Sequence, residues 1–565
     1  MIPPLVFIDF EFNQRPGEHP RPLCFVAYSE AFGWVERWLD DTSTPCFGPH
    51  TLVAYYATAE LLCYKTLGWQ EPARILDLYA EFANLTNGWN LSSGKGLLGA
   101  LKFFHLESIE ATEKSEMREL AMRGGNYTAG EKRALLDYCK TDVEALLKLY
   151  KALSPKMNTP QALYRGEYLR SVSTMEFNGI PIDTITYSAI LEHWDDIKQA
   201  IIREVDTEYG CFDGLTFKQS KFARYVENQG MEWPRRDSGA LVLRKEIFRD
   251  MAKTYPQLEL LRQARDALAN MRKAELEVGR DARARCMLSP FGSLTSRNQP
   301  STTKFIFGNA AWRRFLIQPP TGRALIAIDY EQQEFGIAAA LSGDAAMREA
   351  YQTGDPYLAF AKQAGAVPQD ATKKTHKSVR DLYKTAALAL QYGMGKGSLS
   401  KRLNIPEWQA EQLIQHHKRV YKRFWEWIDA YVVDALSRGH TTTKFGWRFN
   451  TTDAKERTLL NFPIQSHGAE ILRLACALLH ERGFKLIAPI HDAVVLEASA
   501  TDAEEASLQA EATMEEASQW VLENFMIRTE AKIIYYPGRY DDERGRPFWE
   551  LIQRHLPQHK RENHA

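Results

Sequence analysis

The chain has 565 residues, of which 44% are hydrophobic and 25% charged, the usual range for folded proteins. At ~100 to 200 residues per domain, this length accommodates three or four domains. We expect no membrane span, because no run of about 18 uncharged apolar residues occurs, and no signal peptide, because no basic segment precedes the apolar start MIPPLVFIDFEF. The seven cysteines form no C-x-x-C pair, so neither a disulfide framework nor a zinc site is indicated, and we expect an intracellular, cytoplasmic protein.

The net charge of −1 is unevenly distributed along the chain. Residues 1–150 carry 14 Lys and Arg against 20 Asp and Glu, a balance of −6. Residues 235–285 carry 13 against 8, a balance of +5, and residues 370–425 carry 12 against 4, a balance of +8. Local basic surfaces of this kind let a nearly neutral protein bind a polyanion. The alternative is that these charges lie on solvated helix faces.

The predicted elements divide the chain into an N-terminal α/β region and a longer region after it. A strand at residues 5–8 and a helix at 130–152 bound the first region. Segment 154–160, SPKMNTP, has the composition of a linker. The later elements are, in order, a helical region to about 290 with the basic run LLRQARDALANMRKAEL, a loop at 289–305, a strand LIAIDY leading into a helix at 332–341, several helices over 355–440, and a hairpin at 487–498.

Two acidic residues of the second region lie at the ends of apolar strands. Asp329 ends the strand in GRALIAIDY, with Glu334 in the first turn of the next helix. The segment IAPIHDAVVLEA predicts a tight hairpin with His491 and Asp492 at its tip. The simpler interpretation makes Asp492 only a turn former. Two carboxylates on rigid strands also meet the requirement for two Mg²⁺ ions ~3.5 to 4 Å apart in phosphoryl transfer.

The segment KSVRDLYKTAALALQYGMG predicts a helix with four residues of one face spaced four apart, namely Arg380, Lys384, Leu388 and Tyr392. Alanines between them favour the helix, and two glycines after it end it. Such a face presents two fixed positive charges to a triphosphate and then a ring on which a base can stack. The alternative is a surface helix with solvated cations and a packed tyrosine.

These three segments, in this order and at these separations, resemble motifs A, B and C of the family A DNA polymerases, relatives of bacterial DNA polymerase I. The stretch ERTLLNFPIQSHGAEIL resembles the family's Arg-x3-Asn-x-Pro-x-Gln segment through Arg457, Asn461 and Gln465. TSRNQPS resembles its Thr-Gly-Arg element through Arg297, and MEFNGIPID resembles its entry to the polymerase domain. The resemblance covers roughly residues 160–540.

The resemblance implies a multidomain α/β (α+β) fold. A ribonuclease H-like exonuclease domain at residues 1–153 would precede a right-hand polymerase domain at residues 160–565. The polymerase domain would divide into a thumb at about 190–290, a palm at about 291–345 and 440–565, and fingers at about 346–439. The basic segments would then lie in the thumb and the fingers, against the phosphates of the DNA.

The family implies a role for each matching residue. Asp329 and Asp492 would bind two Mg²⁺ ions, with the carbonyl of Tyr330 as a further ligand. Arg380 and Lys384 would hold the incoming triphosphate, and Lys384 would also protonate the pyrophosphate leaving group.

Other residues are implied to contact the nucleotide or the DNA. Gln332, Leu388 and Tyr392 belong to the nucleotide site, where Tyr392 would guard the nascent base pair. Glu334 would occupy the 2′ side of the sugar and exclude ribonucleotides by bulk. Contacts with the primer terminus, minor groove or template are implied for Arg297, Arg457, Asn461, Gln465 and His491.

Two positions depart from the family pattern. Ala493 follows Asp492 where the family commonly has Glu, but that Glu is not the indispensable metal ligand, so we still expect activity. Leu388 stands where an aromatic residue is usual, at a position that touches the sugar face. We therefore expect altered discrimination against sugar-modified nucleotides, which Leu388→Phe and Leu388→Tyr test through dideoxynucleotide incorporation.

Four acidic or tyrosine positions in the N-terminal region form a second pattern. FIDFEFN places Asp9 and Glu11 on one face of a strand, and DYCKTDVEALLKLY places Tyr138 and Asp142 four apart on a helix. These segments resemble the first and third motifs of the proofreading 3′ to 5′ exonucleases. The resemblance implies two divalent ions bound by acids, with the tyrosine orienting the attacking water.

The second exonuclease motif is atypical. The family supplies an Asn and an Asp, whereas LVAYYATAELLCYKTLG has Tyr56 near the Asn position and Glu60 for the Asp. Glu can bind a metal, but its extra methylene moves the charge. Asp77 is a reserve candidate. The alternative is a degenerate exonuclease domain kept as a structural platform.

We therefore expect a monomeric DNA-templated DNA polymerase with a proofreading exonuclease, acting on primer-template DNA and dNTPs, without a membrane partner. No room for a 5′ nuclease domain precedes Asp9, a compactness similar to bacteriophage polymerases, which act in the host cytoplasm. A single-subunit RNA polymerase would need room for a 2′-OH where Glu334 stands. A catalytically silent DNA-binding scaffold would not need the acids of motifs A and C or the cations of motif B.

Overall fold

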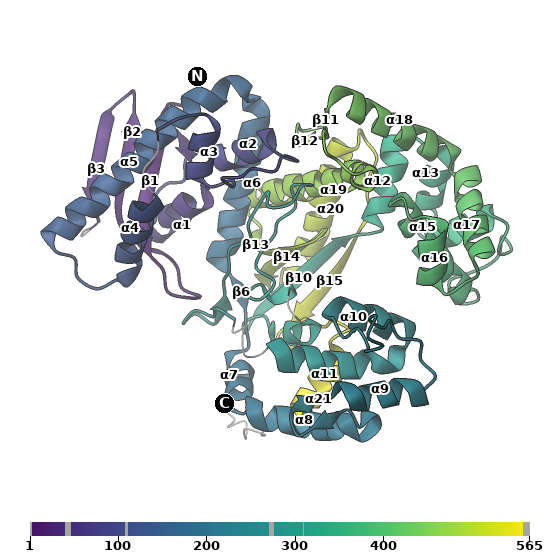
Figure 1. Cartoon of the computed structure of the whole chain (residues 1–565). Coiled ribbons are helices and arrows are strands. Elements are labelled where there is room, and N and C mark those ends of the chain that lie inside the picture. Colours follow the sequence, from purple (N-terminus) through teal and green to yellow (C-terminus); the bar gives the residue numbers. More distant parts are fainter. Residues whose placement is uncertain (1–2, 40–46, 108–110, 271–275, 309, 557–565) are drawn as a thin grey trace.

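The computed structural model describes residues 3–39, 47–107, 111–270, 276–308 and 310–556. Figure 1 shows an N-terminal sheet with its helices beside a central sheet, and two helical groups that flank the central sheet above and below. In the described ranges, no helix is both long and apolar enough to cross a membrane. The mixed arrangement of helices and strands confirms the predicted fold class.

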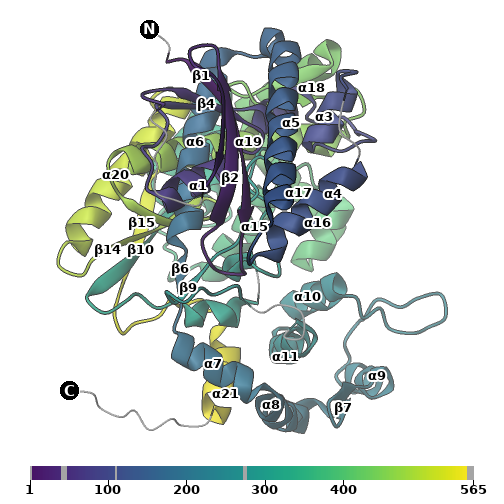
Figure 2. The same ribbon diagram turned by 90° about the vertical axis from the view of Figure 1, so that its left-hand side faces the viewer.

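The N-terminal sheet has the strand order β3-β2-β1-β4-β5. Its strands are β1 (Leu5–Asn13), β2 (Arg21–Ser29), β3 (Gly33–Trp38), β4 (Thr51–Ala54) and β5 (Arg74–Asp77). The first three strands pair antiparallel, and β4 and β5 continue the sheet parallel to β1. Helices therefore cover both faces, and Figure 2 shows α5 running along the sheet beside β1 and β2.

The helices of the N-terminal region are α1 (Thr58–Leu67), α2 (Leu78–Leu85), α3 (Leu97–Phe103), α4 (Ala111–Arg123) and α5 (Ala129–Leu153). The helix predicted at 130–152 is confirmed as α5. Thr128 starts α5 with a capping box, in which its hydroxyl accepts from the Glu131 N–H and the Glu131 carboxylate accepts from the Thr128 N–H. A buried stripe of apolar residues on α5 packs against β1 and β2.

The segment predicted as a linker, 154–160, contains the short connection between α5 and α6 but is not loop throughout. A 3₁₀ turn occupies Ser154–Lys156, and α6 (Thr159–Asn178) begins after two further residues. Asn158 caps α6 by accepting a hydrogen bond from the Gln161 N–H. Both prolines of the segment lie in first helical turns, where the missing N–H costs nothing, so they start helices instead of breaking them. α6 contacts strands of both sheets, β5 and β13.

The central sheet has the strand order β13-β14-β10-β15 and is antiparallel throughout. Its strands are β10 (Arg323–Tyr330), β13 (Lys485–Ile490), β14 (Ala493–Ser499) and β15 (Thr529–Tyr535). The predicted hairpin is confirmed as β13 and β14, and the predicted helix after Tyr330 as α12 (Gln333–Ser342). α19 (Glu456–Glu481) and α20 (Ala503–Val521) pack together, and α20 also contacts β10, β14 and β15.

Two helical groups and several short strands complete the fold. The upper group in Figure 1 contains α13 (Ala345–Gln352), α14 (Pro356–Gln363), α15 (Lys377–Gln391), α16 (Lys396–Leu403), α17 (Glu407–Val420) and α18 (Lys422–Arg438). The lower group contains α7 (Thr184–Glu192), α8 (Trp194–Tyr209), α9 (Gln219–Asn228), α10 (Lys245–Thr254), α11 (Glu259–Asn270) and α21 (Arg546–His555). The short strands are β6 (Ile180–Pro181), β7 (Phe212–Asp213), β8 (Thr216–Phe217), β9 (Arg283–Ala284), β11 (His440–Thr442) and β12 (Arg448–Asn450).

The basic run predicted within the helical region corresponds to α11, and its residues 271–275 lie outside the described ranges. The predicted loop at 289–305 is confirmed, because these residues form only turns and bends. The six described cysteines are free, as the absence of a disulfide framework predicts. The bounds of exonuclease, thumb, palm and fingers stay a prediction.

Candidate active sites

The hairpin of β13 and β14 carries Asp492 to the end of β10, where Asp329 lies. His491 and Asp492 form its two-residue turn, and His491 takes a left-handed φ of 55°. Strand pairing sets Asp329 opposite Ala493. The two carboxyls lie within hydrogen-bonding reach of each other. Desolvation, then the charge of Asp492 and the hydrogen bond with it, raise the pKa of Asp329 to about 7.

The donors at this pair suit divalent cations. Carboxylate oxygens are preferred ligands of Mg²⁺, and no Lys or Arg of the described residues forms an ion pair with Asp329 or Asp492. On the other side of Asp329, β15 pairs Glu530 with it, and this third carboxylate also raises the pKa of Asp329. The ring of Tyr330 is buried, and its hydroxyl donates to the Met514 carbonyl, which holds this end of β10 in place. Asp329, Asp492 and Glu530 therefore form an acidic cluster at this end of the central sheet.

The predicted face of α15 brings two cations together. Arg380 donates to Asp355 at 2.6 Å and to Asp381 at 3.1 Å. The guanidinium of Arg380 and the ammonium of Lys384 lie 5.6 and 5.7 Å from the centre of the Tyr357 ring. Leu388 is partly buried against the core one turn further on.

Tyr392, the cap residue after α15, lies beside Glu334 of α12. Burial, then the charge of Glu334, raise the pKa of Tyr392. Arg297, from the loop at 289–305, reaches Glu334 at 3.9 Å. The side chain of Gln465 from α19 lies close to the Tyr392 hydroxyl. Four segments far apart in sequence therefore meet at Glu334 and Tyr392.

Gln332 precedes α12 in a left-handed conformation with a φ of 47°. Its side-chain oxygen accepts a hydrogen bond from Arg528 at 3.3 Å, and Arg528 also pairs with Glu331 at 3.0 Å. The structure thus gives Gln332 a partner at the start of β15, and its contact with a nucleotide stays a prediction.

The predicted DNA-contacting residues of α19 share one face. Arg457, Asn461 and Gln465 recur every four residues along the helix, and the side-chain oxygen of Asn461 is buried without a partner. His491 and Arg297 line a cavity of about 440 Å³ between the base of the loop at 289–305, α19 and β13. Arg297 and His491 therefore border one cavity, whereas Arg457, Asn461 and Gln465 are not among its lining residues.

The N-terminal region holds a second acidic site. Asp9 and Glu11 from β1, Glu60 from α1 and Asp142 from α5 interact electrostatically with one another. Burial, then the charge of Asp142, raise the pKa of Asp9 to about 8, and burial followed by Asp9 raises the pKa of Glu11 and Glu60. One carboxylate oxygen each of Asp9, Glu60 and Asp142 is buried without a hydrogen-bond partner. Such oxygens are suited to a cation that compensates their desolvation.

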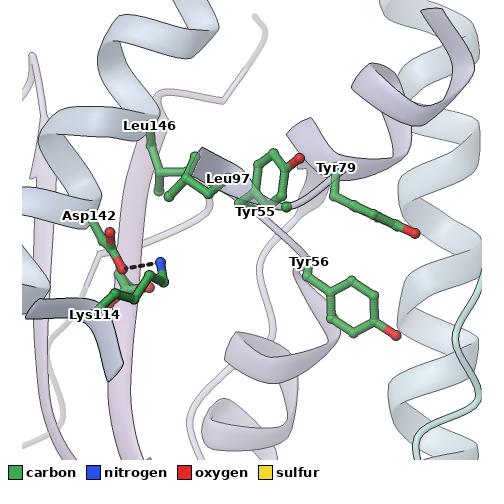
Figure 3. Close-up of a pocket in the computed structure, with 9 residues that line it drawn as sticks. Tyr55, Tyr56, Tyr79, Leu97, Lys114, Asp142 and Leu146 are labelled. Atoms are coloured by element: carbon green, nitrogen blue, oxygen red, sulfur yellow. Dashed lines mark hydrogen bonds and ion pairs between the residues drawn. The ribbon is translucent and has the colours of Figure 1, made fainter. Parts of the chain in front are cut away.

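A cavity of about 280 Å³ opens at this acidic site. It is lined by Asp9, Tyr55, Tyr56, Tyr79, Gly96, Leu97, Lys114, Asp142 and Leu146. Figure 3 shows Lys114 reaching Asp142, with an Nζ to Oδ2 distance of 3.2 Å. Within the described ranges, no three or more His, Cys, Asp and Glu side chains are arranged to hold a metal ion, so this pocket is not a ready metal cage.

The two predicted tyrosines lie in different places. Tyr138 lies beside the acids of the pocket, where burial and then the charges of Asp142, Glu11 and Asp9 raise its pKa. Tyr56 has a φ of 75°, and Figure 3 shows its ring pointing away from Asp142 and Lys114.

The reserve candidate Asp77 is wrong as a pocket acid. Its two carboxylate oxygens accept hydrogen bonds from the backbone N–H groups of Ala57 and Ala80, so it caps α2 and fixes the loop before α1. Burial raises the pKa of Asp77 to about 7, while these bonds oppose the rise. Both oxygens are thereby occupied inside the fold.

Sequence reasoning missed Lys114, Asp355, Tyr357 and Glu530. The charged segment ATEKSEMREL around Lys114 reads as a solvated face, and Asp355 reads as an ordinary helix cap. The strand alternation of TEAKIIY offers the one available signal for Glu530, but the register that sets it opposite Asp329 is visible only in the sheet.

Comparisons with known proteins follow the same division of the chain. Residues 300–533 match the family model described as DNA polymerase family A. Over these residues the chain is similar to DNA polymerase family A. The matched segment contains the acids of β10 and β14, all of α15 and the polar face of α19.

Several DNA polymerases are similar to this chain. DNA polymerase I of Thermus thermophilus is 31% identical over 211 residues, which cover 35% of this chain and 25% of that protein. DNA polymerase I of Aquifex aeolicus is 25% identical over 410 residues, 69% of each chain, and the DNA polymerase of Mycobacterium phage L5 is 25% identical over 372 residues, 63% of this chain and 59% of the phage protein. The match spans only about a quarter of the length of the Thermus relatives.

A solved structure extends the likeness to nearly the whole chain. The POL domain of Pol1 from M. smegmatis, in complex with DNA primer-template and dNTP, superposes with a TM-score of 0.70 at 18% identity. The superposition covers 97% of this chain and 96% of that one. At this identity the likeness shows the fold alone, which is shared with that polymerase domain.

Proposed function

We propose that the chain is a DNA-templated DNA polymerase that adds dNTPs to a primer 3′ end. The observation that supports it best is the contact between Asp329 and Asp492 at the end of the central sheet. Paired carboxylates for metal ions, together with the cations Arg380 and Lys384 on α15, suit a substrate with a triphosphate and a metal-bound α-phosphate. The match of residues 300–533 to the family A model agrees with this proposal.

In the proposed mechanism, Arg380 and Lys384 bind the triphosphate, and Lys384 gives a proton to the departing pyrophosphate. Asp329 and Asp492 would hold the divalent ions, which supply charge neutralisation for the attack of the primer 3′-OH on the α-phosphate. Since Asp329 and Asp492 form no ion pair with Lys or Arg in the described residues, both carboxylates are free for this role.

Glu334 is proposed to set the sugar specificity. Nη2 of Arg297 lies 3.9 Å from Oε1 of Glu334, and Tyr392 lies beside the same carboxylate. A fixed carboxylate on the 2′ side of the sugar leaves no room for a ribose hydroxyl. This argues for dNTPs and against the single-subunit RNA polymerase alternative.

Primer extension tests the proposal. The full chain with Mg²⁺ and a primer-template should extend the primer with dNTPs and fail with NTPs. Asp492→Asn should abolish extension while DNA binding, measured by fluorescence anisotropy, persists. Extension retained in that variant would refute the role of Asp492, and absence of extension in the unmodified chain would favour a silent DNA-binding scaffold.

We also propose that the N-terminal pocket is a 3′ to 5′ exonuclease site. The unpartnered oxygens of Asp9, Glu60 and Asp142 support it, because buried carboxylates without partners are otherwise costly. Tyr138, beside these acids, would orient the attacking water. The test is removal of a 3′-mismatched nucleotide without dNTPs, compared with Asp9→Ala. Equal rates for both, or none for either, would favour the degenerate platform.

A further inference from the structure

Lys114 lies inside the N-terminal acidic pocket. Its ammonium is 3.2 Å from Oδ2 of Asp142 and 5.9 Å from the centre of the Tyr138 ring. Its charge also opposes the rise in the pKa of Asp9 and Glu11. Among the described residues that line the cavity, Lys114 is the only Lys or Arg.

The pocket has more negative charge than one ammonium neutralises. Asp142 gives one oxygen to Lys114, while its Oδ1 has no partner. Oδ2 of Asp9 and Oε2 of Glu60 are likewise buried and unpartnered. The lysine therefore satisfies one oxygen of one acid and leaves the others without a compensating group.

The position of the ammonium conflicts with a metal at the same carboxylate. A Mg²⁺ ion binds oxygen at about 2.0 to 2.1 Å. An ion on Oδ2 of Asp142 would then lie within a few ångströms of an ammonium that already contacts this atom, and two cations so close in a desolvated pocket repel strongly.

Lys114 can leave the pocket more easily than the acids can. Its side chain is 36% exposed, whereas that of Asp142 is 9% exposed. It reaches in from α4 on a flexible four-carbon stem, while the acids are fixed on β1, α1 and α5.

We propose that Lys114 is a resident counter-cation of the pocket, which divalent ions must displace from Asp142 before they bind. The inference rests on the proposed exonuclease site and adds its regulation, because the metal concentration at which the site fills is set by the competing lysine. In the absence of metal, Lys114 keeps the acids together and the site closed to catalysis.

Metal binding measured apart from cleavage tests this inference. The probe is Mn²⁺, titrated by isothermal calorimetry into the full chain carrying Asp329→Asn and Asp492→Asn, so that the other acidic pair does not contribute. Lys114→Met, which keeps the stem and removes the charge, should bind Mn²⁺ at least ten-fold more tightly than this background. Lys114→Arg should keep the background affinity, and adding Asp9→Asn should abolish the gain.

Lys148→Met is the matched control. Lys148 pairs with Glu107 at 3.6 Å on the surface, so its removal should leave Mn²⁺ affinity unchanged. If Lys114→Met does not fold, as judged by circular dichroism, Lys114→Gln takes its place with the same expectation.

Unchanged or weaker Mn²⁺ affinity on loss of the Lys114 charge would overturn the inference. The outcome is separable from that of the proposed nuclease. Tighter Mn²⁺ binding without cleavage of a mismatched primer would uphold the counter-cation and refute the nuclease. Cleavage with unchanged Mn²⁺ affinity would do the reverse.

Discussion

The chain holds two clusters of carboxylates, and they differ in where the nearest positive charge lies. At the end of the central sheet, Asp329 and Asp492 contact each other. The cations Arg380 and Lys384 lie on α15, outside this sheet. In the N-terminal pocket, Lys114 contacts Asp142 directly. The first site, here called the separated site, thus leaves its acids unpaired with its cations, whereas the second pairs an acid with a cation.

This difference teaches what an acidic site needs before a substrate arrives. Separated charges would leave room for an anion and for metal ions, at the expense of burial and then carboxyl repulsion, which raise the pKa of Asp329. A pairing lysine relieves that repulsion but occupies an oxygen that a metal would use. In our proposal, a metal would therefore meet no paired cation at the first site but would compete with one at the second.

The largest expected effect comes from removing one charge of the separated site. Asp329→Asn should lower the rate of primer extension by about 10⁴-fold or more, a scale usual for a residue of the reacting centre. The same variant should unfold at an unchanged or higher temperature, because one of two repelling carboxyls is neutral. Stopped-flow extension and calorimetric melting measure the two quantities.

Asp502→Asn serves as its control, because Asp502 lies on the exposed surface before α20. It should change neither quantity. A clear loss of melting temperature in Asp329→Asn would mean that this carboxyl stabilises the fold, and the contrast between the two acidic sites would then fail.

Both acidic sites could be predicted in part from sequence, for a physical reason. Alternating apolar residues around a two-residue step determine a hairpin locally, so the exposed tip at Asp492 could be foreseen. The four-residue spacing of Arg380 and Lys384 likewise predicts one helix face. These features depend on neighbours in sequence.

The rest depends on contacts that sequence does not encode locally. Lys114 sits among charges typical of a solvated helix, and only the packing of α4 near β1 carries it into the pocket. Glu530 faces Asp329 through the register of β15. The linker predicted at 154–160 extends two residues too far, because Pro marks both loops and helix starts, and the cap at Asn158 decides between them.

A second prediction concerns the junction between the two regions. Arg165 of α6 forms two hydrogen bonds of 2.6 Å with Glu81 of α2, and both side chains are 3% exposed. Arg165→Met leaves a buried carboxylate unpaired, so the free energy of unfolding should fall by about 3 to 5 kcal/mol. Urea unfolding followed by circular dichroism measures it.

The double variant Glu81→Leu with Arg165→Met removes both charges and should recover most of that loss. Equal instability of the single and double variants would show that packing, and not the unpaired charge, causes the effect. The contact between α2 and α6 would then depend on packing and not on the ion pair.

A third prediction uses Glu176, a buried carboxyl outside both sites, as a reference. Its carboxylate accepts a hydrogen bond from the Leu288 N–H at 2.6 Å, and burial raises its pKa to about 7. The folded state therefore holds this proton more firmly than the unfolded state, so the free energy of unfolding should fall as the pH rises from about 4.5 to 7. The loss should reach about 2 to 3 kcal/mol.

Glu176→Gln stays neutral and keeps an acceptor for Leu288, so its stability should exceed that of the unmodified chain increasingly across this pH window. Urea unfolding at several pH values measures the difference. Because Glu176 binds no metal in our proposal, Mg²⁺ should leave this difference unchanged. A difference that vanishes with Mg²⁺ would mean that Glu176 responds to a metal site.

The smallest expected effect tests whether the ion pair between Arg380 and Asp355 limits nucleotide binding at the separated site. Asp355 binds Arg380 through Oδ2 and caps α14 through Oδ1, which accepts from the Leu358 N–H. Asp355→Asn keeps the cap and removes the ion pair, so Arg380 becomes freer to bind a triphosphate. A partly exposed ion pair is worth about 0.5 to 1 kcal/mol, so the KM for dNTP should fall by about two- to five-fold.

Asp381→Asn is the matched control, because Asp381 pairs with the same guanidinium from an exposed position, 49% accessible, and should lower KM less. Single-nucleotide incorporation measures both. A KM that rises in Asp355→Asn would mean that Asp355 positions Arg380 for the substrate. Nucleotide binding would then depend on the Arg380–Asp355 ion pair, as metal binding is proposed to depend on the Lys114–Asp142 pair. The two sites would differ only in whether the incoming group takes the place of the acid or of the cation.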